Sequence, residues 1–502
     1  MASLSAASGL ILSIILYAYL MPLALCFVSG DFMRDVTQST LGSLNSKTKP
    51  NAVLVSVQLP GVTDLEHRSS LEELSRLVHT LGMNVVATIS QKRKALAGSS
   101  IVGEGKLKDI SSWTGGTGVV PGFTKHSSGV GINEESEEDD YHAELDEDPV
   151  GGDPHLDPKL KAEFVVFDNE LTPTQSKNLE DALGAEVMDR TGVIVEIFHR
   201  HAKTPAAKAQ VEIARLTYLT PRIRATGGGE RQGGGIGAKG AGETQHELDK
   251  RRIRDRIAEL RQDLERIHRE EALRRDRRRE QMKLSLVGYT NAGKSSLMRA
   301  LTGSDVLVAD KLFATLDTTV RAVHPETKPK ILVSDTVGFI KKLPHDLVAS
   351  FRSTLDEALD ASLLLFVVDA SDPSFRSQLE TTKSVLSEIG ATENENLLIL
   401  NKDDRLSAIE RSTLQAEYPD AIFLSTRDAV SVKRLRDICV AHFEKEMIEA
   451  IVAVPYSKGA AVAEMHQHMR VLGETHDETG TNITVRCFPG DLDRVKKNHG
   501  LR

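Results

Sequence analysis

The chain has 502 residues, which exceeds the size of one compact core and predicts about three domains at roughly 150 residues each. Hydrophobic residues make up 40% of the chain and charged residues 27%, which argues against a wholly disordered chain, a collagen-like repeat and a polytopic membrane protein. The three cysteines, Cys26, Cys439 and Cys487, are too widely spaced for a disulfide framework or a thiolate zinc site. The composition therefore favours a globular protein in a reducing compartment.

The formal net charge of −9 hides an uneven distribution. Ten acidic residues and no Lys or Arg lie between Glu134 and Asp148, and without this block the remaining chain carries +1. Such a block predicts a solvated, disordered insertion. In contrast, Asp249–Lys283 holds fourteen Lys or Arg against nine Asp or Glu. The acidic total therefore does not exclude a nucleic-acid partner.

An apolar segment, Gly9–Gly30, lies within the first thirty residues, which carry no charged side chain. Its length would span a bilayer, but it lacks the basic start and the clean cleavage site of a secretory signal. Three interpretations are open: a membrane anchor, a signal peptide, or an extension upstream of the functional protein, with Met33 as an internal start. The polar residues up to position 50 are expected to form a linker.

Apolar β-branched runs alternate with helical patterns after this leader, which predicts parallel βαβ units and an N-terminal α/β domain over residues 51–202. Gly, Pro, Ser and the acidic block interrupt the pattern, so a disordered insertion is expected at 111–161. The expected strands are Val53–Val57, Val85–Ile89 and Phe164–Phe167, and the expected helices are Leu71–Leu81 and Pro173–Leu183.

A helical hairpin is predicted over residues 203–282. Helix Thr204–Tyr218 is followed by Gly227–Gly242, in which nine of sixteen residues are glycine and regular structure is excluded. The capping-box spacing of Thr244 and Glu247 then predicts a second helix. Its apolar seam predicts pairing with the first helix, and its arginine face is either solvated and balanced by acids or contacts nucleic acid. The seam consists of Ile253, Ile257, Leu260, Leu264 and Ile267.

The glycine loop also contains a G-x-G-x-x-G match, at 235–240. No strand precedes this match and no βαβ unit surrounds it, so the sequence argues against a dinucleotide site there.

The strongest motif is G-x-x-x-x-G-K-S at 288–295 (GYTNAGKS), between a short apolar strand at 283–288 and helix-forming residues Ser296–Thr302. The backbone N–H groups of such a loop surround phosphates at the start of a helix. We expect Lys294 to neutralise the β- and γ-phosphates and Ser295 to offer its hydroxyl to Mg²⁺.

Two further motifs end apolar runs. Asp335-Thr336-Val337-Gly338 follows the run 331–334, and Asn401-Lys402-Asp403-Asp404 follows the run 397–400. Asp335 can hold Mg²⁺ through water, and the Gly338 amide can approach a γ-phosphate. Asp404 can accept both N1–H and N2–H₂ of guanine, a donor pair that adenine lacks, while Lys402 lies over the base. The three motifs in this order, at the carboxyl ends of strands, predict a guanine-nucleotide-binding domain.

Two details of this domain bear on hydrolysis. A threonine that senses Mg²⁺ and the γ-phosphate is needed between the first two motifs, and spacing alone leaves Thr315, Thr318 and Thr319 as candidates. Phe339 stands where a Ras-like enzyme carries the glutamine that orients the attacking water, so hydrolysis is expected to be slow without a partner. A packed Phe339 predicts the same slow rate.

Ser425-Thr426-Arg427 follows a later strand-like run and is expected to lie behind the guanine.

These motifs resemble the HflX family of translation-associated GTPases. The resemblance rests on GYTNAGKSS, LFATLD, DTVGFIKKLPHDLV and NKDD, and upstream on SQKR, VGEGK, ELTPTQSKNLE, DRTGVIVEIFHRHAKT and RQGGGIGAKGAGETQHELDKRRI. It covers about residues 52–447, excluding the acidic insertion.

The resemblance implies an N-terminal α/β domain with a hairpin, a GTPase domain at 283–447 and a small α+β domain at 448–502. It implies Mg²⁺ bound by Ser295 and Thr315, and catalysis that depends on Lys294, Thr315 and Gly338. The predicted GTP and GDP site consists of Gly288, Tyr289, Thr290, Asn291, Ala292, Gly293, Lys294, Ser295, Phe313, Ala314, Thr315, Leu316, Asp317, Asp335, Thr336, Val337, Gly338, Asn401, Lys402, Asp403, Asp404, Ser425, Thr426 and Arg427.

The resemblance also implies a partner. It predicts a cytoplasmic, monomeric GTPase that binds the large ribosomal subunit, contacts ribosomal RNA through the glycine loop and the basic hairpin, and splits, rescues or helps assemble ribosomes. Two other hypotheses remain: a membrane-tethered switch anchored by Gly9–Gly30 that acts on a protein, and a binding module that does not hydrolyse GTP.

Overall fold

The computed structural model describes residues 49–96, 98–120, 161–222, 245–276, 282–303, 312–313, 315, 319–342, 358–391 and 394–501. The predictions for the apolar leader, the acidic block, the glycine loop and the Thr244 cap lie outside these residues. The chain divides into two compact units, Met1–Thr63 with Gly82–Asp189, and Asp64–Leu81 with Arg190–Arg502. Within the described ranges, no helix combines the length and apolarity needed to cross a bilayer.

The first unit is built on a four-stranded parallel sheet in the order β2-β1-β3-β4. Strand β1 is buried at every position after Asn51, as expected for the middle of a parallel sheet. Ile110, Trp113 and Leu179 share a core with the strands. The elements are β1 (Asn51–Gln58), β2 (Asn84–Lys92), α3 (Glu104–Thr114), β3 (Phe164–Phe167), α4 (Pro173–Leu183) and β4 (Glu186–Asp189). This arrangement confirms the predicted α/β fold of this part of the chain.

Helix α4 has the predicted bounds because its start is encoded locally. The Thr172 side chain accepts from the Gln175 amide while the Gln175 side chain accepts from the Thr172 amide, and Pro173 occupies the first turn. Helix α3 and strand β4 were not predicted. The predicted insertion 111–161 was wrong at its start, because α3 continues to Thr114 and buries Trp113.

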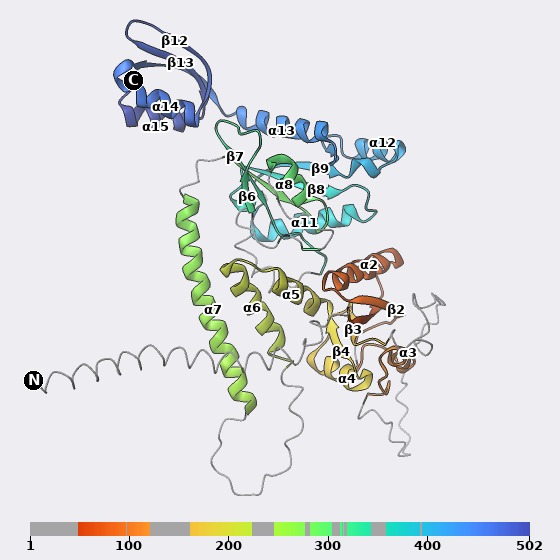
Figure 1. Ribbon diagram of the computed structural model, residues 1–502. Coiled ribbons are helices and arrows are strands. Elements are labelled where there is room, and N and C mark those ends of the chain that lie inside the picture. The colour runs from red at the N-terminus through yellow and green to blue at the C-terminus, as the bar shows by residue number, and fades with distance from the viewer. Residues whose placement is uncertain are drawn as a thin grey trace, which may run out of the picture. The chain divides into compact units, whose positions relative to one another are not determined.

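The second unit contains α2 (Asp64–Thr80), α5 (Arg190–His201), α6 (Pro205–Leu219) and α7 (Gln245–Asp276). Helices α6 and α7 lie side by side (Figure 1), as the hairpin prediction required. Ile253 and Leu260 of the seam are 2% and 6% exposed. Outside the seam, arginines pair with acids three or four residues away in the pairs Arg252–Asp249, Arg256–Glu259, Arg266–Asp263 and Arg269–Glu265. Contact with nucleic acid stays a prediction.

A six-stranded sheet in the order β10-β9-β8-β5-β7-β6 follows, in which only β6 among these strands is antiparallel to its neighbour. Successive side chains of β8 point to opposite faces of the sheet and therefore pack in two different cores. Leu365 packs in one core with α8 and α13, and Val368 packs in the other with α11 and α12. The elements are β5 (Met282–Val287), α8 (Lys294–Thr302), β6 (Thr319–Ala322), β7 (Ile331–Asp335), β8 (Leu363–Asp369), α11 (Phe375–Ile389), β9 (Glu395–Asn401), α12 (Ala408–Glu417), β10 (Ile422–Leu424) and α13 (Ala429–Glu444).

The chain ends in a three-stranded antiparallel sheet of order β11-β13-β12, with two helices that share its core. Its elements are β11 (Ile448–Pro455), α14 (Gly459–His468), β12 (Arg470–His476), β13 (Gly480–Cys487) and α15 (Pro489–His499). The predicted fold class, with its mostly parallel central sheet and small C-terminal α+β part, is therefore confirmed. The exact domain boundaries stay predictions.

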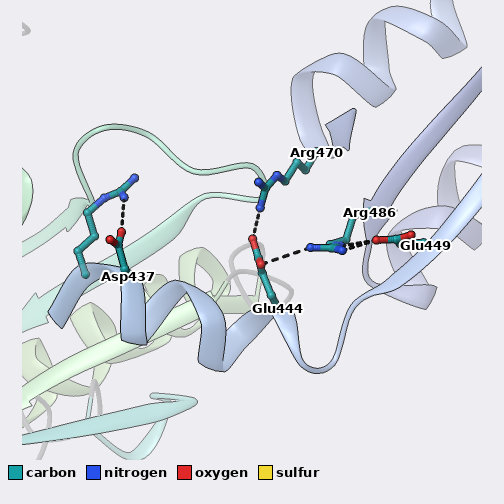
Figure 2. A network of polar contacts seen from close by, with 6 residues as sticks. Asp437, Glu444, Glu449, Arg470 and Arg486 are labelled. Atoms are coloured by element: carbon teal, nitrogen blue, oxygen red, sulfur yellow. Dashed lines mark hydrogen bonds and ion pairs between the residues drawn. The ribbon is translucent and has the colours of Figure 1, made fainter. Parts of the chain in front are cut away.

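Glu444 joins the end of α13 to this last sheet (Figure 2). Its carboxylate contacts Arg470 of β12 and lies 3.5 Å from Arg486 of β13, while Arg486 also pairs with Glu449 of β11. These side chains are partly exposed, so each pair contributes little alone, but the shared Glu444 carboxylate connects α13 with β12 and β13 and, through Arg486, with β11.

Leu365 provides a test of the central core. Its side chain is fully buried, so Leu365→Ala is expected to lower the free energy of unfolding by about 2–5 kcal/mol, because the neighbours cannot fill the cavity. Guanidinium denaturation measures this loss. Ile409→Ala, at a residue that is 78% exposed on α12, is the control and should change the value by less than about 0.5 kcal/mol. Equal losses in the two variants would contradict the described core.

Candidate functional site

The three sequence motifs converge at one edge of the central sheet. The phosphate loop follows β5, Asp335 ends β7 and Asn401 ends β9, and these strands run parallel, so their carboxyl ends meet. A cavity of about 390 Å³ lies at this edge. The predicted residues that line it are Thr290, Asn291, Gly293, Lys294, Ser295, Phe313, Thr315, Thr336, Gly338, Asn401, Lys402, Asp404, Thr426 and Arg427.

Seven other predicted residues do not line the cavity. Gly288, Tyr289, Ala292, Asp335, Val337, Asp403 and Ser425 lie within two residues of cavity-lining residues in the chain without themselves lining the cavity. Thr336 donates to the Leu286 carbonyl of β5 at 2.8 Å, and Asp403 pairs with Arg411 of α12 at 3.3 Å. Both side chains therefore serve the fold in this structure. Ala314, Leu316, Asp317 and Thr318 lie outside the described residues.

The phosphate loop is fixed against the end of β9. Gly293 has φ of +97°, and a Cβ atom there would lie 2.2 Å from Asn401 Nδ2. The same Asn401 amide donates to the Ala292 carbonyl at 2.8 Å. The glycine is thus required both by the left-handed backbone and by the close approach of the neighbouring strand.

Lys294 supplies a buried positive charge at the phosphate end of the cavity. Its Nζ atom donates to the carbonyls of Gly288 at 3.0 Å and Tyr289 at 2.8 Å. Burial lowers the pKa of Lys294 to about 8, against the opposing effect of the Asp335 carboxylate. A phosphate in this cavity would restore the preference for the charged form.

Three oxygen-bearing side chains meet beside Lys294. Ser295 Oγ lies 2.7 Å from Thr315 Oγ1 and donates to Asp335 Oδ2 at 2.7 Å, while Thr315 Oγ1 donates to the same carboxylate oxygen at 3.1 Å. The structure therefore brings Thr315 into the cluster. Of its two sequence alternatives, Thr319 pairs with Asp335 in the β6–β7 ladder, and Thr318 lies outside the described residues.

The cluster suits a hard divalent cation. Asp335 is fully buried, and its Oδ1 atom has no hydrogen-bond partner among the described residues. Burial raises the pKa of Asp335, and Lys294, Ser295 and Thr315 oppose this rise. A cation with its water ligands would supply a hydrogen-bond partner for Asp335 Oδ1 and favour the ionised carboxylate. Hydroxyl and carboxylate oxygens are ligands that Mg²⁺ accepts. The donor set therefore fits Mg²⁺.

Gly338 and Phe339 lie directly against the phosphate loop. A Cβ atom on Gly338 would come within 2.8 Å of Thr290 Cγ2 and 3.1 Å of Lys294 Nζ, so the backbone here is close to the phosphate end. The Phe339 amide donates to the Gly288 carbonyl at 3.2 Å, and its side chain is 3% exposed. Phe339 is thus a packed residue in this structure.

The opposite end of the cavity carries the acceptor expected for guanine. Ser425 Oγ donates to Asp404 Oδ1 at 2.7 Å, and Arg427 lies 3.7 Å from the other oxygen. The Ser425 hydrogen bond is the main cause that lowers the pKa of Asp404, which keeps it an acceptor. Lys402 spans the two ends, because its Nζ donates to the Asn291 carbonyl at 3.0 Å and to Asp369 Oδ2 at 2.6 Å.

Sequence reasoning missed three residues of the site. Ser296 and Arg405 line the cavity, and Asp369 anchors Lys402. Ser296 and Arg405 directly follow recognised motifs. Asp369 ends the apolar run LLLFVVD, so the rule that strand-end residues lie at the ligand edge could have identified it.

Three family models match successive parts of the chain. The model described as GTP-binding GTPase N-terminal matches residues 68–120 and 156–199, and GTP-binding GTPase Middle Region matches residues 201–278. The model described as 50S ribosome-binding GTPase matches residues 283–402, which contain the first two nucleotide motifs and the first two residues, Asn401 and Lys402, of the third.

Two bacterial proteins named GTPase HflX are similar over most of the chain. That of Gluconacetobacter diazotrophicus is 54% identical over 454 residues, which cover 90% of this chain and 98% of the relative. That of Caldanaerobacter subterraneus subsp. tengcongensis is 34% identical over 454 residues, which cover 90% of this chain and 94% of the relative. A solved GTP-binding protein from the archaeon Sulfolobus solfataricus, in complex with GDP, is 22% identical with a TM-score of 0.42 and covers 79% of this chain and 100% of that one.

The lowered pKa of Lys294 predicts how nucleotide affinity depends on pH. Below about pH 8 the free protein already carries the ammonium charge, so GDP affinity should be constant. Above it, binding must take up a proton, and affinity should fall by up to about tenfold per pH unit. Calorimetric titration between about pH 7 and pH 9, in buffers of different ionisation enthalpy, measures both the affinity and the proton uptake. Constant affinity over this range would contradict the described environment of Lys294.

Asp404 predicts the base preference. Asp404→Asn replaces one acceptor with an amide that opposes the guanine donors, so GDP affinity should fall about 100-fold or more. Xanthosine diphosphate, which carries a carbonyl in place of the guanine amino group, should then bind better than GDP. Fluorescence titration compares the two nucleotides, with Asp420→Asn on the exposed α12–β10 turn as the control. Unchanged preference for GDP would place the base elsewhere.

Proposed function

The chain belongs to the HflX family of GTPases, which bind and hydrolyse GTP, and we propose that it does so on the large ribosomal subunit. The observation that carries the nucleotide assignment is the single edge of the central sheet at which the phosphate loop, Asp335 and Asp404 converge around one cavity. The ribosome assignment rests on the match of residues 283–402 to the ribosome-binding GTPase model.

Each end of the cavity has its own chemical task in this proposal. The phosphate-loop amides and the Lys294 ammonium bind and neutralise the β- and γ-phosphates, and the Gly338 amide donates to the γ-phosphate. Asp404 accepts from the guanine edge while Lys402 lies over the ring. The hydrogen bond from Lys402 to the Asn291 carbonyl fixes the guanine end of the cavity relative to the phosphate loop.

Ser295 and Thr315 would hold Mg²⁺, with Asp335 accepting from its water ligands. When bound, Mg²⁺ neutralises charge on the β- and γ-phosphate oxygens. The protein supplies the positions: Asp335 already accepts from both hydroxyls, so the donors are gathered before the ion binds. Thr315 thereby connects its chain segment to the presence of the γ-phosphate.

Hydrolysis by the isolated protein should be slow and partner-stimulated. Of the described residues that line the cavity, none is a glutamine or histidine that could orient a water molecule, and Phe339 is buried. We infer that the group that orients the water lies elsewhere in the chain or is supplied by the ribosome.

The proposed partner surface is the hairpin of α6 and α7 with the glycine loop. Asp249–Lys283 carries fourteen basic against nine acidic residues, a balance suited to the phosphates of ribosomal RNA. We propose that the protein acts there as a cytoplasmic monomer that splits, rescues or helps assemble ribosomes.

Ribosome pelleting tests this function. With a non-hydrolysable GTP analogue, the protein should co-sediment with large subunits, and its phosphate release from GTP should rise by an order of magnitude or more when ribosomes are added. Lys294→Ala, which loses the phosphate charge, is the control and should show neither effect. Retention no greater than that of Lys294→Ala would reject the ribosome assignment. Recovery of the native protein in the membrane fraction would instead favour the tethered-switch hypothesis.

A further inference from the structure

We propose that Tyr289 is a positioning residue for GTP hydrolysis, which holds the segment after Gly338 against the phosphate loop and is itself held by Glu73 of α2. This inference rests on the proposed function, since it concerns the rate of the same reaction. Tyr289 does not line the nucleotide cavity, so it acts through its neighbours and not on the nucleotide.

The Tyr289 hydroxyl uses both of its hydrogen-bonding capacities inside the protein. It donates to Glu73 Oε1 and accepts from the backbone N–H of Lys341 at 2.7 Å. The side chain is 5% exposed, so water competes for neither bond. Burial is the main cause that raises the pKa of Tyr289, and the neighbouring Glu73 carboxylate adds to it, so the hydroxyl stays protonated and remains a donor.

Glu73 is held in turn by a buried cation. Its second oxygen, Oε2, pairs with Arg190 at the start of α5, and Arg190 is 1% exposed while Glu73 is 7% exposed. A carboxylate this deep is tolerated only when it is paired and hydrogen-bonded. The pair with Arg190 therefore fixes the Glu73 carboxylate that orients the Tyr289 hydroxyl, although Glu73 and Tyr289 are 216 positions apart in the sequence.

Three hydrogen bonds then fasten the segment that follows Gly338 to the phosphate loop. Two are between backbones, from the Phe339 amide to the Gly288 carbonyl at 3.2 Å and from the Thr290 amide to the Phe339 carbonyl at 2.8 Å. The third is the bond from the Lys341 amide to Tyr289, and of the three only this one depends on a side chain. Tyr289 therefore extends the attachment two residues beyond Phe339.

This attachment sets the position of Gly338. Gly338 precedes the fastened segment directly, and its backbone already lies against Thr290 and Lys294. A displacement of Lys341 would also move Gly338, because only two residues separate them in the main chain. Small displacements of groups that face the γ-phosphate have large effects on the rate of hydrolysis. A phenylalanine ring would fill the same space as the tyrosine ring. We therefore assign the positioning to the hydroxyl, which makes the hydrogen bonds to Glu73 and Lys341.

The test is Tyr289→Phe, which keeps the ring and removes only the hydroxyl. We expect kcat for GTP hydrolysis to fall about tenfold, the loss associated with one buried hydrogen bond. KM and the dissociation constant for GDP should stay within about twofold, because the hydroxyl does not reach the cavity. Tyr418→Phe, at the end of α12 and away from the cavity, is the matched control and should leave kcat unchanged.

A double-mutant cycle separates positioning from general destabilisation. If Glu73 acts through the hydroxyl, Glu73→Gln should lower kcat in the wild-type background and have no further effect on kcat in Tyr289→Phe. Equal effects of Glu73→Gln in both backgrounds, or a Tyr289→Phe enzyme whose kcat stays within about twofold of wild type, would overturn the inference. Its failure is distinguishable from failure of the proposed function, in which the wild-type protein itself would show no hydrolysis dependent on Lys294.

Discussion

One hydrogen bond, from the Asn401 amide to the Ala292 carbonyl, joins the phosphate loop to the strand that carries the base-recognition motif. The bond is possible because Gly293 places no side chain where that amide lies. It helps to fix the spacing between Lys294, to which we assign the phosphates, and Asp404, to which we assign the guanine. Lys294 is two residues from Ala292 and Asp404 is three residues from Asn401, so the positions of both depend on this bond.

The phosphate end balances two buried charges of opposite sign. Lys294 and Asp335 are both buried, and each opposes the effect of burial on the other's pKa. The Asp335 charge is not fully compensated within the described residues, because one of its carboxylate oxygens has no hydrogen-bond partner there. A site of this kind is held ready for an anionic ligand together with a cation, and its polar groups are fully satisfied only when both are bound.

The fold and most of the cavity lining could be predicted from the sequence, because the motifs are short and each follows an apolar strand. Residues whose role comes from distant contacts could not. Helix α5 contains the run GVIVEIF, which favours a strand by composition, yet Val193 and Phe198 are buried in a helix, as packing overrides propensity. Glu73 likewise lies on an ordinary amphipathic helix, and nothing in its local sequence indicates the buried pair with Arg190.

The contacts of α2 also bear on what counts as a complete GTPase module in this chain. The residues that carry the nucleotide motifs begin at β5, but the compact unit that contains them also includes Asp64–Leu81 and α5. A fragment cut just before β5 would lack α2 and α5, so the Tyr289 hydroxyl would lose Glu73 as its acceptor. In this chain, the compact unit that holds the nucleotide motifs is discontinuous in sequence, and Glu73 in its first segment lies 216 positions before Tyr289 of the phosphate loop.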